Sequence, residues 1–110
     1  MILWRGIKKV MEEMGELLTV FGKLEVVPQG RHWDERYSPP LRQRCWDECG
    51  DLYAALDYFT EHNFTPGEQV LIQERRRYKR ARFEGWVLSG IACDECGVPL
   101  GSENHPVKAE

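Results

Sequence analysis

The amino-acid sequence predicts an all-α protein: an antiparallel helical bundle completed by oligomerisation, with a short cysteine-containing tail at its C-terminal end. Two observations predict this class. Apolar residues recur at three- and four-residue intervals in long segments, and proline and glycine separate these segments. A chain of 110 residues buries one modest core, which oligomerisation or a structural metal often supplements. We therefore expect one helical domain over residues 1–90 and a tail over residues 91–110.

The first predicted helix covers Ile2–Phe21, and Gly22 supplies a C-terminal stop. Its apolar residues have helical spacing: Leu3, Ile7, Val10, Met11, Met14, Leu17, Leu18 and Phe21. Charged residues interrupt them every few positions, so this segment is typical neither of a signal peptide nor of a membrane span. We expect a cytoplasmic protein with no membrane partner.

A loop is predicted over residues 23–37, with room for a short extended piece at Leu24–Val27. Ser38 followed by Pro39 is typical of a helix start, because serine caps the first turn and proline fits the first helical position. The second helix should extend from there to about Asn63.

The third helix should begin at Pro66. Thr65 is a suitable cap, Pro66 fits the first helical position, and Glu68 follows three residues after the cap. The helix should end near Ser89-Gly90, and the tail beyond it has turn residues but no helical period.

Two acidic clusters fall on the core-facing sides of the first two predicted helices. At about 100° per residue, Glu48 lies inside the apolar stripe of the second helix and Asp51 lies at its border. That stripe consists of Leu41, Cys45, Cys49, Leu52, Leu56 and Phe59. On the first helix Glu13 falls among apolar residues, Glu16 sits at their edge and Glu12 points towards solvent. The apolar neighbours of Glu13 are Val10, Leu17 and Val20.

Carboxylates on a core-facing stripe need a compensating cation or hydrogen bonds. Two helices that each offer acids at i and i+3 could present four carboxylates to one small volume, the oxygen-rich environment that Mg²⁺ prefers. Each cluster taken alone is typical of a solvated helix face. Because both clusters turn towards apolar stripes, we favour a metal site, with Mg²⁺ as the cofactor and Mn²⁺ as a substitute.

The two motifs in this order resemble the signature of the MazG-like all-α nucleoside triphosphate pyrophosphohydrolases, which is Glu-Glu-x-x-Glu followed after a spacer by Glu-x-x-Asp. Here they read Glu12-Glu13-Met14-Gly15-Glu16 and Glu48-Cys49-Gly50-Asp51. The segments EEMGELLTVFGKL and DECGDLYAALDYFTEHN are similar to the helical blocks of small, phage-related members. The resemblance covers roughly Val10 to Asn63 and extends more weakly into the third predicted helix.

The resemblance implies Glu13, Glu16, Glu48 and Asp51 as metal ligands and Glu12 as an outer acid, a candidate to accept a proton from water. The implied reaction is attack of water between the α and β phosphates of a nucleoside triphosphate, which releases a nucleoside monophosphate and pyrophosphate. Magnesium would neutralise phosphate charge and lower the pKa of a bound water. The family builds its sites in packed bundles, so a homodimer or homotetramer is implied as well.

Basic and aromatic side chains offer ways to hold the nucleotide, each with an ordinary alternative. Arg75 and Lys79 on the third predicted helix could contact phosphate oxygens, or they could form a solvated, ion-paired surface. Trp33 in the long loop could stack on a base or pack back onto the bundle. Asn63 could touch sugar or phosphate, or simply end its helix.

The cysteines suggest a structural zinc site. Cys93 and Cys96 look like one knuckle of a zinc ribbon, which supplies half a site. Cys45 and Cys49, four apart on the second predicted helix, could complete it, as could His105 or a second subunit. The alternative is a set of ordinary reduced cysteines, because Cys45 and Cys49 also lie on the apolar stripe.

The sequence therefore predicts a magnesium-dependent nucleoside triphosphate pyrophosphohydrolase, a hydrolase of nucleotide metabolism. One alternative belongs to another class: a noncatalytic metal-binding helical dimer that acts as a binding or regulatory module. A third idea is nucleic-acid binding through the basic run from Arg75 to Arg82, which the formal net charge of −3 disfavours.

Overall fold

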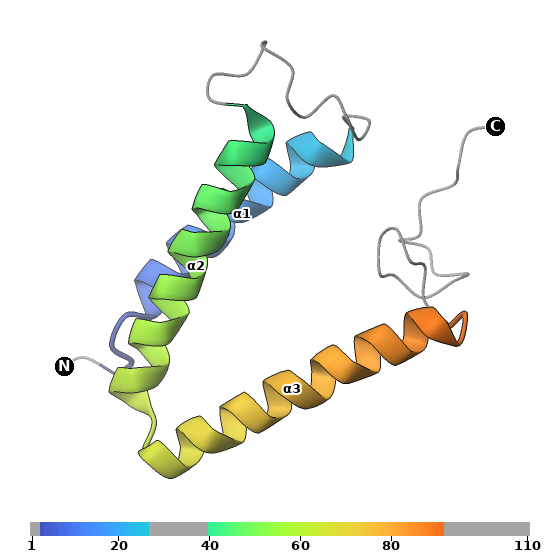
Figure 1. Ribbon diagram of the computed structural model, residues 1–110. Helices are drawn as coiled ribbons and strands as arrows, with labels where there is room; N and C mark the ends of the chain where they lie inside the picture. The colour runs from blue at the N-terminus through green and yellow to red at the C-terminus, as the bar shows by residue number, and fades with distance from the viewer. Residues whose placement is uncertain (1–2, 27–39, 92–110) are drawn as a thin grey trace. The chain divides into compact units, whose positions relative to one another are not determined.

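The computed structural model describes residues 3–26 and 40–91, which form three α-helices and no strand. These are α1 (Ile7–Glu25), α2 (Leu41–Asn63) and α3 (Pro66–Leu88) (Figure 1). The predicted all-α class is confirmed for this part of the chain. The chain divides into two units, Met1–Pro66 with α1 and α2 and Gly67–Glu110 with nearly all of α3. None of the described helices is long and apolar enough to span a membrane.

Helix α1 differs from its predicted bounds at both ends. It begins at Ile7 rather than Ile2, because Gly6 adopts a left-handed conformation with φ of 82° just before it. A Cβ atom at Gly6 would lie 2.8 Å from Cδ1 of Tyr58, so the turn brings α1 close against α2. Gly22 does not stop the helix, which continues to Glu25. An isolated glycine costs a helix only about 1 kcal/mol, which the packing of its neighbours offsets.

The predicted extended piece at Leu24–Val27 is therefore wrong over its first half, which is helical. Val27 and the rest of the predicted loop lie outside the described residues. Helix α2 ends at Asn63, as predicted, but it begins at Leu41 with Pro40 in the cap position, two residues later than the predicted start with Pro39 in the first turn. The predicted cap at Ser38-Pro39 also lies outside the described residues.

Helix α3 matches its prediction at both ends. It begins at Pro66, and after Leu88 the chain turns through Gly90, whose φ is 76°. The N–H of Gly90 donates to the carbonyl of Val87 at 3.1 Å, and the N–H of Ile91 donates to that of Trp86 at 2.8 Å. This pair of bonds is a Schellman motif, which requires the left-handed glycine.

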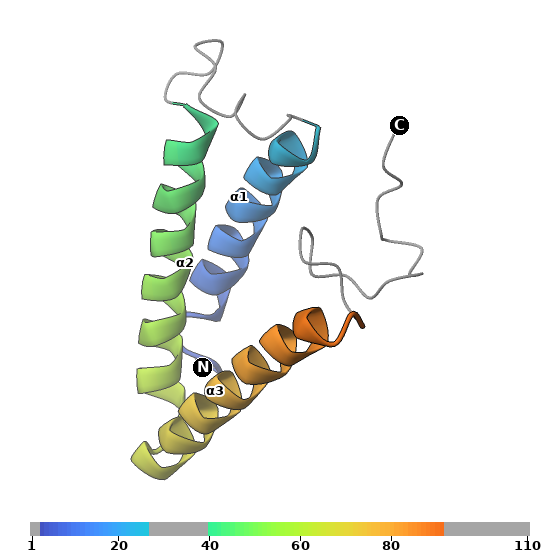
Figure 2. The same ribbon diagram turned by 45° about the vertical axis from the view of Figure 1, so that its right-hand side comes forward.

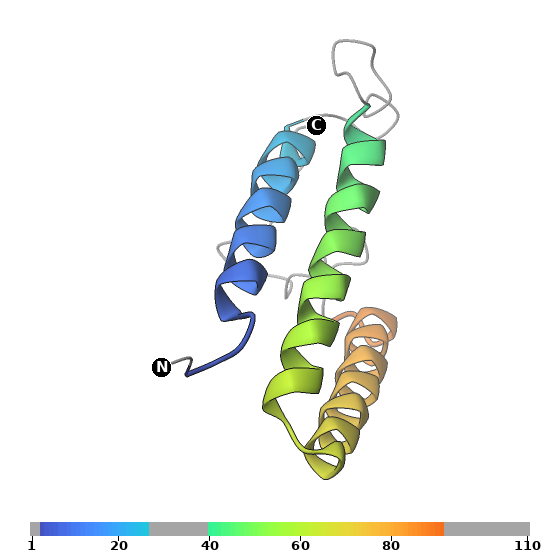
Figure 3. The same ribbon diagram turned by 90° about the vertical axis from the view of Figure 1, so that its left-hand side faces the viewer.

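Helices α1 and α2 run antiparallel and pack along their length (Figures 2 and 3). The buried apolar side chains are Val10, Leu17, Val20, Leu41 and Ala55. The predicted stripe of α2 needs one correction: Leu56 is 38% exposed, and its neighbour Ala55 is buried instead. A small side chain at this position permits close approach of the two helices, so the contact face is rotated slightly from the one that hydrophobicity indicated.

The chain before α1 is tied to the end of α2 by Asn63. The side-chain amide of Asn63 donates to the carbonyl of Arg5 at 2.7 Å, and its oxygen accepts from the N–H of Arg5 at 2.9 Å. The rings of Trp4 and Phe59 lie beside this contact with centroids 6.0 Å apart. The open end of the helical hairpin is therefore closed by both hydrogen bonds and aromatic packing.

Candidate metal centre

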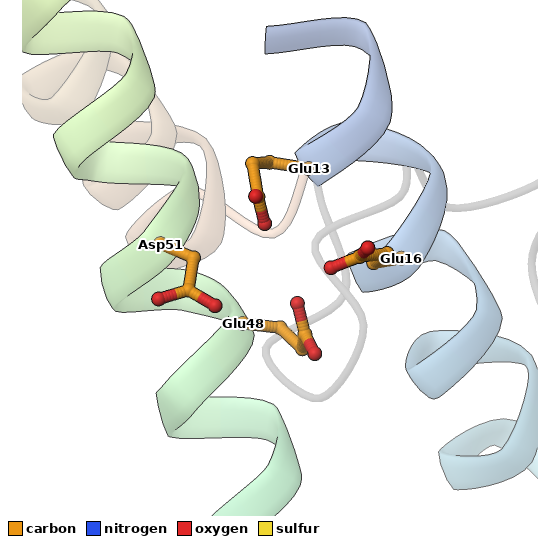
Figure 4. A group of neighbouring side chains, drawn as sticks. All are labelled: Glu13, Glu16, Glu48 and Asp51. Atoms are coloured by element: carbon orange, nitrogen blue, oxygen red, sulfur yellow. The ribbon is translucent and has the colours of Figure 1, made fainter. Parts of the chain in front are cut away.

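Four carboxylates from the two predicted motifs converge between α1 and α2. Glu13 and Glu16 extend from α1, Glu48 and Asp51 extend from α2, and their side chains point towards one another (Figure 4). One oxygen from each residue lies within 4.8 Å of the others. The structure thus brings together all four acids that the sequence analysis selected as metal ligands.

The cluster has a buried side and an exposed side. Glu13 is only 5% exposed because it lies on the buried face of α1, and Glu48 is half-buried on α2. Glu16 and Asp51, each one turn further along its helix, are exposed. The antiparallel packing therefore leaves the four carboxylates accessible from one side, where a ligand could approach.

Two buried oxygen atoms in this cluster are unsatisfied. Oε2 of Glu13 and Oε2 of Glu48 find no hydrogen-bond partner in the described part of the chain. The other oxygen of Glu13 is compensated, because Nζ of Lys9 lies 3.1 Å away. A buried carboxylate oxygen without a partner is costly, and a cation among the four acids would remove that cost at both positions. The residues present therefore fit a bound cation.

The carboxylates also repel one another. A hydrogen bond with Glu48 raises the pKa of Glu16 above its usual value, and the negative charge of Glu13 raises it further. A bound cation would offset this repulsion and favour the ionised form of Glu16.

The donor set and its dimensions suit a hard divalent ion. All four candidate ligands offer carboxylate oxygen, which favours Mg²⁺, Mn²⁺ or Ca²⁺ over the thiophilic metals. In octahedral Mg²⁺ coordination, bonds of about 2.1 Å place opposite ligand atoms about 4.2 Å apart. The 4.8 Å spread of the cluster is slightly wider, so small side-chain adjustments would close it around one ion.

Lys9 is a residue of this site that the sequence analysis missed. Its ammonium group lies 3.3 Å from Oε1 of Glu12 and 3.1 Å from Oε1 of Glu13. The hydrogen bond to Glu13 makes the largest contribution to raising the pKa of Lys9, and the hydrogen bond to Glu12 raises it further. Lys9 precedes Glu12 by three residues and Glu13 by four, and these helical spacings could have identified Lys9 from the sequence. Glu12 is 57% exposed and is not among the four clustered acids, so its proposed role stays a prediction.

The remaining predicted site residues are Asn63, Arg75, Lys79 and Trp33. Asn63 is engaged by the backbone of Arg5 and also donates to the carbonyl of Phe59 at 2.7 Å, which gives its amide a structural role. Arg75 and Lys79 belong to the second unit, and their role in binding a substrate stays a prediction. Trp33 lies outside the described residues.

The predicted zinc site is described only in part. Cys45 and Cys49 are half-buried and line a pocket of about 340 Å³ together with Leu24, Arg42 and Trp46. Burial raises the pKa of the Cys45 thiol, and the neighbouring Cys49 raises it further. The remaining predicted ligands, Cys93 and Cys96, lie outside the described residues, as does His105.

Comparison of the chain with protein-family models, curated proteins and solved structures gave no match. The features that point to a function are therefore the converging carboxylates and the order of the two motifs that supply them.

Proposed function

We propose that this protein hydrolyses a nucleoside triphosphate to a nucleoside monophosphate and pyrophosphate with the help of Mg²⁺. One observation carries the proposal: four carboxylates from Glu-Glu-x-x-Glu and Glu-x-x-Asp converge, and two of their buried oxygens have no partner within the described residues. Buried carboxylate oxygens without a partner favour a cation, and the motif pair resembles the signature of the MazG-like pyrophosphohydrolases.

The buried and exposed acids would have different tasks. Glu13 and Glu48 would hold Mg²⁺ from the buried side, and Glu16 and Asp51 from the accessible side, where triphosphate oxygens complete the coordination. Once bound, Mg²⁺ would neutralise phosphate charge and lower the pKa of a coordinated water. Four carboxylates carry more negative charge than one divalent ion neutralises, so the cluster suits a second ion that arrives with the substrate.

Glu12 is the proposed proton acceptor for the attacking water. Its exposed carboxylate can pass the proton on to solvent, which a buried ligand could not do. Lys9 is hydrogen-bonded to Glu12 and also contacts Glu13, so it restrains an outer acid next to a metal-binding one. Lys9 is therefore a positioning residue for both acids.

The hairpin of α1 and α2 is proposed to work as part of a homodimer or homotetramer. Its outer face carries Met14, Leu18 and Phe21, and Leu18 is 69% exposed. These side chains line a second pocket of about 340 Å³ with Leu17 and Leu52. Exposed apolar side chains gathered around one hollow are typical of a surface that another chain covers.

Replacement of Leu18 by glutamate should turn the oligomer into a monomer, because a charge would be buried at the contact. Sedimentation equilibrium at micromolar concentration measures this, with Lys8→Glu as a control on an exposed position of the same helix. A wild-type chain that is monomeric at all concentrations would contradict the proposed oligomer.

The reaction is tested by pyrophosphate release from a panel of canonical and modified nucleoside triphosphates, in Mg²⁺ and in chelator. Glu48→Gln should lower kcat/KM by at least about 10³-fold, since it removes a ligand that also balances the ion's charge. Glu61→Gln, an equal change at an exposed acid of α2, should keep wild-type activity. If a folded, metal-loaded wild type releases neither pyrophosphate nor phosphate from any nucleotide, the chain is a noncatalytic metal-binding module instead.

A further inference from the structure

One face of α3 alternates cationic and aromatic side chains over three turns. Arg75, Tyr78, Arg82 and Trp86 follow one another at spacings of three and four residues, and Lys79 lies four residues after Arg75 and three before Arg82, so all five lie along a single face. We refer to these five residues as the basic aromatic face. It lies entirely within α3, and no residue of α3 is buried.

The members of this face are in contact with one another. The guanidinium carbons of Arg75 and Arg82 lie 5.0 Å and 5.5 Å from the ring centroid of Tyr78. Arg82 also lies 5.2 Å from the ring of Trp86, and Lys79 lies 5.9 Å from it. In addition, Nη1 of Arg82 donates to the hydroxyl of Tyr78 at 2.9 Å. The cations and rings are therefore held in fixed positions before any ligand binds.

The charge of α3 is opposite to that of the whole chain. Residues 67–91 contain six basic side chains, Arg75, Arg76, Arg77, Lys79, Arg80 and Arg82, and three acidic ones, Glu68, Glu74 and Glu84. This segment therefore carries a local surplus of positive charge, while the complete sequence has a net charge of −3. The negative net charge of the whole chain is therefore compatible with a local positive surface on α3 that can attract an anion.

We propose that the basic aromatic face of α3 binds single-stranded nucleic acid. Guanidinium groups stacked on rings keep their N–H donors in the plane, where phosphate oxygens can accept them. Tyr78 is 48% exposed and Trp86 is half-buried, so both rings keep accessible surface against which unpaired bases can pack. The face thus presents both partners that a single strand requires, a track of positive charge and rings for stacking.

The dimensions favour a strand over a single nucleotide. From Arg75 to Trp86 the face rises about 16 Å at 1.5 Å per residue. Phosphates in a stacked strand follow one another about every 3.4 Å, so the face matches several consecutive nucleotides. A duplex would meet the cations equally well, but its stacked bases would leave the rings of Tyr78 and Trp86 without a partner.

A membrane surface fits this face less well. Helices that lie in a lipid interface carry their apolar side chains on one face and their cations on the other. On α3 the cation of Arg75 lies over the ring of Tyr78, and that of Arg82 lies over the rings of both Tyr78 and Trp86. Insertion of these rings into lipid would therefore also move the charged guanidinium groups into the lipid.

The test is fluorescence anisotropy of a labelled oligothymidylate of about 12 nucleotides with the full chain. Chelator is present, so that the carboxylate cluster takes no part. The expected dissociation constant is micromolar at low salt, and the log–log slope against salt is about −2 for three phosphate contacts. A duplex of equal length should bind more weakly, and vesicles of phosphatidylcholine and phosphatidylglycerol should not bind.

Matched variants distinguish binding to the basic aromatic face from binding to positive charge anywhere on α3. Arg75→Gln with Arg82→Gln should weaken binding about tenfold, whereas Arg77→Gln with Arg80→Gln, an equal change of charge on the opposite side of α3, should weaken it less than about threefold. Trp86→Leu, which leaves the charge unchanged, should weaken it about fivefold or more. Circular dichroism checks that every variant stays helical.

Equal losses in the two double variants, or equal affinity for duplex and single strand, would overturn the proposal. So would vesicle binding without strand binding, which would assign the face to a membrane.

Discussion

The two units of this chain place their charges in opposite ways. In the unit of α1 and α2, Glu13 and Glu48 are drawn into the contact between helices, and two of their oxygens find no partner within the described residues. In α3, by contrast, no residue is buried, and cations stack on the rings of their own helix. From this difference we expect a cation to raise the stability of the first unit, whereas a ligand on α3 should have little effect on stability.

A second contrast concerns what holds each unit together. Helices α1 and α2 share buried side chains from both partners, and Asn63 ties the chain before α1 to the end of α2. Helix α3 is held by contacts along its own length, such as the ion pair of Arg80 with Glu84 at 3.5 Å. Exposed pairs of this kind contribute little, so the free energy of folding should come mostly from α1 and α2.

The largest expected difference between the units follows from truncation of one leucine in each. Leu17→Ala should lower the free energy of unfolding by about 2–4 kcal/mol, because it leaves a cavity between α1 and α2. Leu71→Ala on α3, where the side chain is 62% exposed, should change it by less than about 0.5 kcal/mol. Urea unfolding followed by circular dichroism measures both. Equal losses at the two positions would mean that α3 packs as tightly as α1.

A smaller effect distinguishes two glycines of the first unit. Gly6→Ala should destabilise by about 1–3 kcal/mol, since its φ of 82° is strained for alanine and the new Cβ would meet Tyr58. Gly22→Ala should stabilise by about 0.5–1 kcal/mol, because Gly22 lies inside a helix with open space around it. Thermal melts of the two variants show the sign. A stable Gly6→Ala protein would contradict the close approach of α1 and α2 at this end.

The sequence predicts correctly those features that depend only on residues close to one another along the chain. The ends of α3 follow from the cap and proline at Thr65-Pro66 and from the glycine turn at Gly90, and the facing of Glu13 and Glu48 follows from helical spacing. The predicted start of the first helix at Ile2 and its predicted stop at Gly22 were wrong. Gly6, just before the helix, approaches Tyr58, a residue far along the chain, whereas Gly22 has open space around it and stays helical.

Two features of the first unit depend on contacts that no local pattern contains. The amide of Asn63 binds the backbone of Arg5, which only the packing of α1 on α2 brings within reach. Ala55 rather than Leu56 is buried because of the way the two helices approach. Lys9 is a different case, since its spacing from Glu12 and Glu13 was visible in the sequence but was not used.

Thermal melts in chelator and in MgCl₂ test most directly whether the four carboxylates form a cation site. Mg²⁺ should raise the Tm of the wild type and of the Glu61→Gln control, because it binds the folded chain only. Glu48→Gln should have a higher Tm than the wild type in chelator, since it removes one of the crowded charges, and should gain nothing from Mg²⁺. If Mg²⁺ stabilises the wild type and Glu48→Gln equally, or stabilises neither, the carboxylate cluster is not the metal site.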